Sequence, residues 1–442
     1  MHSISIFPVW DEYTSSKTTG PGNALNLLDR KRPYGNQKPV CILQGWPIFE
    51  LYYFTMKKQS CSYGVLTLTL LCIFFHNTHS QSLYYPDSTW QTKAPAELKM
   101  NARLLDSAVN FAIQNETKTD YDLRVANMKS YVREPNYRIL GPMRERGKPA
   151  GVIVKNGYLV AQWGDVKRVD MTFSATKSYL STVAGLAIDN HLIRNVDDPV
   201  NQYEWDDLYN GEHNSKITWR HLLTQSSDWS GCLFDLCDWA DRPPKEGGID
   251  DWKNRKLLEP GSQFEYNDVR VNLLAYSLLQ VYRKPLPVIL KEKIMDPIGA
   301  STTWRWYGYD NSFVNIDGVM TQSVSGGGHF GGGLFISTLD HARFGLLFLR
   351  KGKWKNQQLI SESWVNAAHQ PSAANKSYGF MWWLNEEKVM KDVSKNIYYA
   401  DGFGGNYIVI DNEHDLVIVA RWLDSAKLGE LIRLVISSID NK

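Results

Sequence analysis

The chain has 442 residues, of which 43% are hydrophobic and 22% charged, and this is the composition of an ordinary globular protein, not of a disordered or fibrous one. The formal net charge is +2 and no run of Lys and Arg marks a basic stripe, so we expect no nucleic-acid partner. Aromatic residues are abundant, with 16 Trp and 23 Tyr, which indicates either aromatic packing or a substrate cleft lined with rings.

Residues 1–55 show no sustained periodicity, whereas residues 56–80 have the anatomy of a secretory signal peptide. Met56 and two lysines precede an apolar run over 64–75, and small polar residues follow. Because signal peptides begin at the initiator, we expect Met56 to be the true start, residues 1–55 to be an upstream or non-native leader, and cleavage near Ser80. An internal hydrophobic anchor is the alternative, but the apolar run is short for a bilayer.

From this leader we expect a periplasmic or secreted protein with no stable membrane span after signal cleavage. Of the five cysteines, only Cys232 and Cys237 lie beyond the expected signal peptide. In an oxidising compartment this pair would close a small disulfide loop; two buried thiols are the alternative. No cluster of histidines, cysteines and acidic residues has metal-site spacing, so we predict neither a metal ion nor an organic cofactor.

After a linker over 81–94, helical and β patterns alternate along the chain. Apolar spacing predicts an amphipathic helix over 97–114, and Asn-Gly at 156–157 predicts a hairpin within 150–163. A long irregular loop is expected over 226–248 and a flexible glycine-rich turn over 326–333. Further helices are expected over 271–281, 286–294, 340–350 and 426–439, and strands over 396–400, 405–411 and 416–422.

The order of these elements predicts the fold class. Strands near both ends surround a helix-rich middle, which implies one antiparallel sheet built from the two ends and flanked by helices. We therefore predict an α/β (α+β) domain over 95–440, with an inserted, mostly helical lobe over about residues 180–330.

Ser174 and Lys177 form a Ser-x-x-Lys motif at the start of a stretch with helical apolar spacing. Residues three apart lie on one side of a helix, so the Lys177 amine can reach the Ser174 hydroxyl. Ser174 would lie in the first turn, where unpaired N–H groups favour a developing anion. The motif alone is weak, because it arises by chance about once or twice in a chain of this length. A capping serine and a surface lysine are the alternative.

Further phrases make the motif specific. The Ser-x-x-Lys motif is followed by Tyr266-Asn-Asp268 and then by a glycine-rich turn between C-terminal strands. Class C serine β-lactamases carry their motifs in the same order. Over about residues 95–440 the chain resembles the β-lactamase-related serine hydrolases, a family that includes penicillin-binding carboxypeptidases, esterases and oligomer amidases. The resemblance also covers the segments Trp219–Ser226, Trp239–Pro243 and Gly332–Asp340.

The resemblance implies roles for the matching residues. Ser174 would be the nucleophile, with Lys177 and Tyr266 sharing the proton transfer. A phenol beside the Lys177 ammonium should have its pKa lowered toward neutrality. Asp268 stands where the lactamases usually carry asparagine, and a carboxylate there would hold Lys177 charged, which leaves the identity of the base open.

The third motif of the family, Lys-Thr-Gly or His-x-Gly, is matched best by Ala400-Asp-Gly402, which lacks the cation. Without an obvious anchor for a substrate carboxylate, an ester or amide substrate is favoured over a β-lactam. Backbone N–H groups of Ser174 and Phe403 are expected to form the oxyanion hole, beside Gly402. His329, in the glycine-rich turn, would line the cleft, or would be a turn histidine without a catalytic part.

These observations predict an exported serine hydrolase that cleaves a small-molecule or peptide-like ester or amide through an acyl-enzyme on Ser174. A D-alanyl-D-alanine carboxypeptidase or β-lactamase is the first alternative. The second is a non-catalytic binding or sensor protein that keeps the same fold.

Overall fold

The computed structural model describes residues 83–135 and 137–440. The expected leader (1–55) and signal peptide (56–80) lie outside the described residues. Within the described part of the chain, no helix is both long and apolar enough to cross a membrane.

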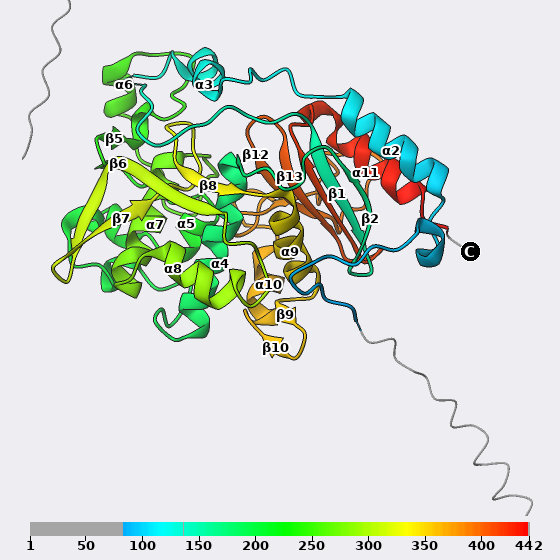
Figure 1. Cartoon of the computed structure of the whole chain (residues 1–442). Helices are drawn as coiled ribbons and strands as arrows, with labels where there is room; N and C mark the ends of the chain where they lie inside the picture. Colours follow the sequence, from blue (N-terminus) through cyan, green and yellow to red (C-terminus); the bar gives the residue numbers. More distant parts are fainter. Residues whose placement is uncertain (1–82, 136, 441–442) are drawn as a thin grey trace, which may run out of the picture. The chain divides into compact units, whose positions relative to one another are not determined.

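A six-stranded antiparallel sheet joins the two ends of the domain, in the order β11-β12-β13-β14-β1-β2 (Figure 1). Strand β1 pairs with β14 from Ala150↔Arg421 to Lys155↔Leu416, so the first hairpin closes onto the last strand. This confirms the predicted sheet. Its strands are β1 (Ala150–Lys155), β2 (Tyr158–Trp163), β11 (Trp383–Leu384), β12 (Tyr398–Gly402), β13 (Asn406–Asp411) and β14 (Leu416–Arg421).

The hairpin between β1 and β2 turns at Asn156 and Gly157, as the dipeptide predicts. Their φ angles are 53° and 87°, the left-handed conformation that a tight hairpin turn requires and that Asn and Gly adopt most readily.

Helices cover both faces of this sheet (Figure 1). Side chains alternate along β14, so that Val417 and Val419 join one core cluster while Leu416 and Ile418 join another. The first cluster includes residues of α4 and α9, and the second includes residues of α2 and α11. Strands β1, β13 and β14 are consequently buried along their whole length.

The helices expected from apolar spacing are found, with shifted ends. The pattern predicted over 286–294 divides into a short α-helix and a π turn at Lys291–Met295. The helices are α2 (Ala102–Gln114), α3 (Leu123–Tyr131), α4 (Thr176–Asp189), α5 (Trp219–Leu223), α6 (Ile249–Lys253), α7 (Asp268–Tyr282), α8 (Leu286–Leu290), α9 (Thr338–Leu349), α10 (Glu362–Ala368) and α11 (Leu428–Ser437).

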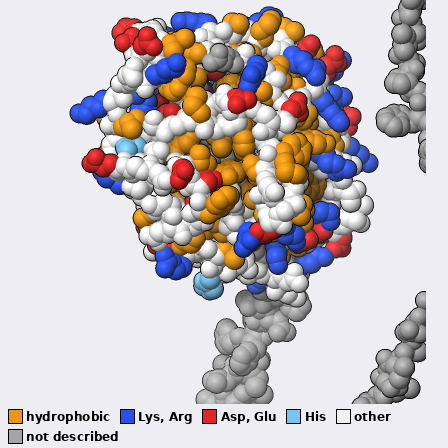
Figure 2. Space-filling view, turned by 90° about the vertical axis from the view of Figure 1, so that its left-hand side faces the viewer, with side chains coloured by type: hydrophobic (Ala, Val, Ile, Leu, Met, Phe, Trp, Pro, Cys, Tyr) orange, Lys and Arg blue, Asp and Glu red, His pale blue; other side chains and the backbone are white. Residues whose placement is uncertain are grey.

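The inserted lobe contains a long hairpin that the apolar pattern did not predict. Its register shifts between Gly308 and Phe313, which breaks the alternation that marks a strand. Phe313 and Met320 are moreover 50% and 62% exposed, so apolar residues stand on the outer face. Figure 2 views the side of the molecule on which this hairpin lies, where apolar and charged side chains are intermingled. The sheet has the order β3-β8-β6-β7, with β3 (Asp170–Met171), β6 (Arg305–Ile316), β7 (Val319–Val324) and β8 (Gly333–Ile336).

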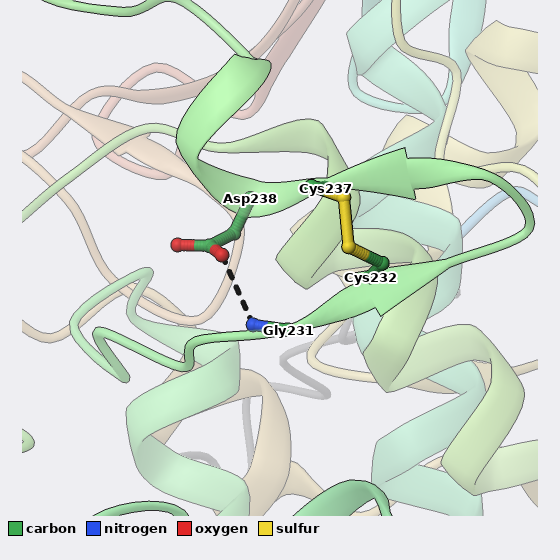
Figure 3. Close-up of a disulfide and its surroundings, with 4 residues drawn as sticks. All are labelled: Gly231, Cys232, Cys237 and Asp238. Carbon is green, nitrogen blue, oxygen red and sulfur yellow. Dashed lines mark hydrogen bonds between the residues drawn. A yellow bond between two sulfur atoms is a disulfide. The ribbon is translucent and has the colours of Figure 1, made fainter. Parts of the chain in front are cut away.

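Cys232 and Cys237 form a disulfide, which decides between the two alternatives drawn from the sequence (Figure 3). They face each other across a small hairpin of β4 (Cys232–Leu233) and β5 (Leu236–Cys237). The backbone N–H of Gly231 donates to Asp238 Oδ1 at 3.0 Å beside it. The bond therefore anchors the irregular loop over 226–248. A further two-stranded ribbon pairs β9 (Lys353–Trp354) with β10 (Gln357–Gln358).

Glu204, in the inserted lobe, has a carboxyl group whose burial makes the stability of the fold depend on pH. Burial raises the pKa of its carboxyl from 4.5 to about 8, with Ser277 opposing the shift and Asp206 adding to it. Folded Glu204 is therefore protonated at neutral pH, whereas the unfolded chain ionises it. Between pH 4.5 and 8 this difference costs roughly 1.4 kcal/mol of folding stability for each pH unit.

We expect Glu204→Gln, which cannot ionise, to be more stable than the natural chain at pH 8, with the advantage vanishing near pH 4, below the pKa of the unfolded carboxyl. Denaturant midpoints measured at both pH values test this. The exposed Glu212→Gln variant is the control and should show no pH-dependent difference. An equal effect of Glu204→Gln at both pH values would contradict the expectation.

Candidate active site

Ser174 lies in a single 3-10 turn, Phe173–Ala175, that leads directly into α4. Phe173 has a φ of 48°, a left-handed conformation that a bulky residue keeps only where packing holds it. Its side chain is 1% exposed, in a cluster with Met171 and Trp422. Packing around Phe173 thus places the Ser174 hydroxyl at the positive end of α4.

Lys177 lies one helical turn further on, and its Nζ donates to Ser174 Oγ at 2.8 Å. The predicted helical spacing therefore brings the two groups together. Nζ also donates to Asp268 Oδ1 at 2.7 Å and lies 3.4 Å from the carbonyl oxygen of Gly326. The Lys177 side chain is only 2% exposed, so these contacts replace its water shell.

Asp268 begins α7 and is the centre of the charges behind the nucleophile. Its Oδ2 accepts from Arg242 Nη2 at 2.7 Å and pairs with His329 Nδ1 at 3.0 Å. Burial by itself would raise the pKa of Asp268, but Arg242, Lys177 and His329 hold it well below the ordinary 3.8. Asp268 is therefore a carboxylate, and its Oδ1 accepts the hydrogen bond of Lys177 Nζ.

Tyr266 stands beside Lys177, with its ring centroid 5.0 Å from Nζ, and stacks on Trp383 at 6.0 Å. The expected lowering of its pKa is wrong. Burial, together with the charge of Asp268, raises the pKa of the phenol well above 10, and Arg242 and the nearby Ser174 hydroxyl oppose this only in part. Asp268 already neutralises the Lys177 ammonium, so Tyr266 rests as a neutral phenol that can donate a proton.

Gly402, at the end of β12, lets that strand approach the nucleophile turn. A Cβ atom at this position would lie 2.0 Å from the carbonyl oxygen of Thr172, so a larger residue would displace the strand. Phe403 follows, and its ring centroid is 5.1 Å from that of Phe173. The backbone of Phe403 thus borders the turn of Ser174, where the predicted oxyanion hole would lie.

The strand position at which the family carries a cation is occupied by Ala400, which is buried. The next residue is acidic, and burial raises the pKa of Asp401 to about 7. Strand β12 therefore brings no positive charge to the site. A positive charge comes instead from Arg242, whose guanidinium lies 5.2 Å from the ring centroid of Tyr266.

The side chain of His329 is only 2% exposed, which agrees with the alternative of a turn histidine and not with a residue that lines the cleft. Nδ1 faces Asp268, Nε2 lies 2.5 Å from Glu134 Oε2, and the ring stacks on Tyr131 at 3.9 Å. Burial lowers the pKa of His329, but the hydrogen bonds to Asp268 and Glu134 outweigh burial and raise it. His329 is thus a buried partner of Asp268 and Glu134.

Sequence reasoning missed three members of this group, which are Glu134, Asp241 and Arg242. Arg242 Nη1 donates to Asp241 Oδ1 at 2.7 Å, and its backbone N–H donates to Glu134 Oε1 at 3.1 Å. The phrase Trp239–Pro243 belongs to the resemblance and was the only available signal. Nothing in the spacing of this segment indicates that Arg242 forms a hydrogen bond with Asp268.

Within residues 83–135 and 137–440, one cluster could hold a metal ion by distance. Glu134, Asp241 and His329 offer ligand atoms within 4.8 Å of one another. Both ring nitrogens of His329 already face carboxylates, however, and Arg242 pairs with Asp241. The cations that these carboxylates need are therefore side chains of the protein, and the group does not fit a metal site.

Comparison with known proteins identifies the family. The β-lactamase family model matches residues 151–422, which span the nucleophile motif, the Tyr266 motif and β12. The chain belongs to the β-lactamase-related family of serine hydrolases.

Solved structures share the β-lactamase-type fold at low sequence identity. EstCE1, a hydrolase with promiscuous acyltransferase activity, is 15% identical with a TM-score of 0.50, over 76% of this chain and 100% of its own. A family VIII carboxylesterase is 13% identical with a TM-score of 0.50, over 77% and 98%. A penicillin-binding protein homologue from Caulobacter crescentus is 13% identical with a TM-score of 0.49, over 72% and 96%. No curated protein matches the chain significantly.

The close approach of β12 gives a prediction for this β-lactamase-family site. We expect Gly402→Ala to push Phe403 away from Ser174 and to lower the rate of covalent labelling by a fluorophosphonate by about 100-fold, the loss typical of one oxyanion donor. Circular dichroism should be unchanged. The control is Gly429→Ala in α11, where the nearest atom to the added methyl is Met390 Cβ, at 3.3 Å. Equal labelling of the two variants would contradict the role of β12.

Proposed function

We propose that the protein hydrolyses an ester or amide of a small-molecule or peptide-like substrate through an acyl-enzyme on Ser174. The observation that carries the proposal is the 2.8 Å contact between Lys177 Nζ and Ser174 Oγ at the start of α4. A serine hydroxyl attacks a carbonyl only when a neighbouring group takes its proton, and here the amine of Lys177 is in reach.

The reaction begins when Lys177 has released its own proton. Its amine accepts the proton of Ser174 Oγ as that oxygen attacks the substrate carbonyl, and the backbone N–H groups of Ser174 and Phe403 stabilise the resulting oxyanion. Tyr266, a neutral phenol, donates a proton to the leaving group and is reprotonated from Lys177. Water then attacks the acyl-enzyme by the same transfers in reverse and frees Ser174.

An ester or amide substrate is favoured over a β-lactam because strand β12 brings no cation that would bind a substrate carboxylate. The strand carries Ala400 and Asp401 where the family has that cation. One specific observation supports the alternative of a β-lactam or D-alanyl-D-alanine substrate. Arg242, with 29% of its side chain exposed beside Tyr266, could pair with a substrate carboxylate. Its pairing with Asp241 and Asp268 leaves little charge for this purpose.

We further propose that the protein is exported to the periplasm or secreted. The disulfide between Cys232 and Cys237 supports this, because such bonds persist in oxidising compartments and are rare in the cytosol. The apolar segment over 64–75 is the sequence feature that would direct export.

The function is tested with p-nitrophenyl acetate and butyrate, nitrocefin, a D-alanyl-D-alanine peptide and a linear amide oligomer, using residues 81–442. We expect ester or amide turnover that falls at least about 1,000-fold in Ser174→Ala, because the nucleophile is lost. The exposed Ser262→Ala variant should retain full activity.

Nitrocefin or D-alanyl turnover, lost in both Ser174→Ala and Arg242→Gln, would favour the carboxylate-bearing substrate instead. If no substrate turns over and no fluorophosphonate labels Ser174, the protein is a binding or sensor protein with this fold and the proposal fails.

A further inference from the structure

Six ionisable side chains form one continuous network behind the nucleophile. They come from five separate parts of the chain, and all but Arg242 are nearly inaccessible to water. Three are basic and three are acidic, so the network is electrically balanced when all are ionised. Its members are Lys177, Arg242, His329, Glu134, Asp241 and Asp268.

The two oxygens of Asp268 serve different partners. Oδ1 binds Lys177 Nζ at 2.7 Å, whereas Oδ2 is shared by Arg242 at 2.7 Å and His329 at 3.0 Å. One negative charge is thus divided among three cations. Lys177 is consequently held as an ammonium less firmly than by a carboxylate of its own, which matters because only the neutral amine can take the Ser174 proton.

The surroundings of His329 determine its charge. Nδ1 faces Asp268, Nε2 faces Glu134 at 2.5 Å, and Asp241 Oδ1 lies 3.8 Å from Nε2. A neutral imidazole has only one N–H and would turn a bare ring nitrogen toward one of these carboxylate oxygens. Arg242 places a cation directly against the ring, with Nη2 3.3 Å from Nδ1, and Lys177 lies on the other oxygen of Asp268. The remaining neighbours with titratable groups are the rings of Tyr131, stacked at 3.9 Å, and Tyr137, at 6.0 Å.

We infer that His329 is a positioning residue whose imidazolium, fixed by Glu134, draws the charge of Asp268 away from Lys177 and so sets the pH at which Lys177 becomes the base for Ser174. This inference rests on the proposed function in its use of Lys177 as the base. The charge state of His329 itself follows from the geometry and can be tested without any substrate.

The direction of the effect follows from the charges. Without the positive charge at His329, Asp268 acts more strongly on Lys177, which then keeps its proton to higher pH. We therefore expect His329→Gln to move the acid limb of the pH profile of kcat/KM upward by about one pH unit. Asp268→Asn removes the anion and should move the same limb downward by a similar amount.

The charge of His329 is measured in the full chain by nitrogen-15 NMR of selectively labelled histidine. We expect one histidine with both ring nitrogens protonated at pH 7.5, and we expect its signals to change in Glu134→Gln. If every histidine at that pH shows one protonated and one bare nitrogen, the inference is overturned. This measurement does not depend on any His329 variant folding, nor on the identity of the nucleophile.

The effect on the base is measured by pH profiles of kcat/KM for the natural chain, His329→Gln, Asp268→Asn and the exposed control His191→Gln. We expect the acid limb to shift upward in His329→Gln, to shift downward in Asp268→Asn, and to stay unchanged in His191→Gln. A loss of kcat in His329→Gln with an unmoved or lowered acid limb would make His329 merely structural and overturn the inference. Turnover that survives in Ser174→Ala would instead refute the proposed function, and the NMR result would still stand.

Discussion

The buried ion pair between Lys177 and Asp268 is the interaction on which the rest of the site depends. Their side chains are 2% and 1% exposed, and removing two charges from water costs several kcal/mol for each ion unless partners replace the lost hydration. The 2.7 Å contact between them satisfies only one oxygen of Asp268. The other oxygen needs donors of its own, and Arg242 and His329 supply them. Those cations in turn require Asp241 and Glu134.

This need for counter-charges explains how the site accommodates an aspartate at position 268, where the family usually carries asparagine. An asparagine at position 268 would need no counter-charge, whereas the aspartate adds a buried negative charge. The added cations balance it, while burial, together with the charge of the same aspartate, keeps Tyr266 a neutral phenol. The departure at position 268 is thus accommodated by electrostatics over several elements, and the Ser-Lys contact that the chemistry needs is retained.

The scaffold positions these charges through two close contacts of the backbone. The sheet closes when β1 pairs with β14, and this brings β12 and its Gly402 against the turn that holds Ser174. The disulfide between Cys232 and Cys237 anchors the loop from which Arg242 reaches Asp268. The position of Ser174 therefore depends on the sheet, whereas Asp241, Arg242, Asp268 and His329 of the surrounding charges come from the inserted lobe.

The sequence by itself determined the features that depend on neighbours in the chain. Asn156-Gly157 specifies a turn, and the continuous apolar run over 416–420 specifies a buried strand. The spacing of Ser174 and Lys177 specifies their contact, because helix periodicity is local. The apolar pattern does not predict the long hairpin of β6 and β7, because the register shift in this hairpin interrupts the strand periodicity.

Only the tertiary structure decided the charge of the site. Glu134 and His329 are 195 residues apart, and Lys177 and Asp268 are 91 apart, so no spacing in the sequence places them together. The predicted lowering of the Tyr266 pKa was wrong for the same reason. The ammonium beside the phenol was visible in the motif, but burial and the competing pairing with Asp268, which reverse its effect, arise only when distant segments pack.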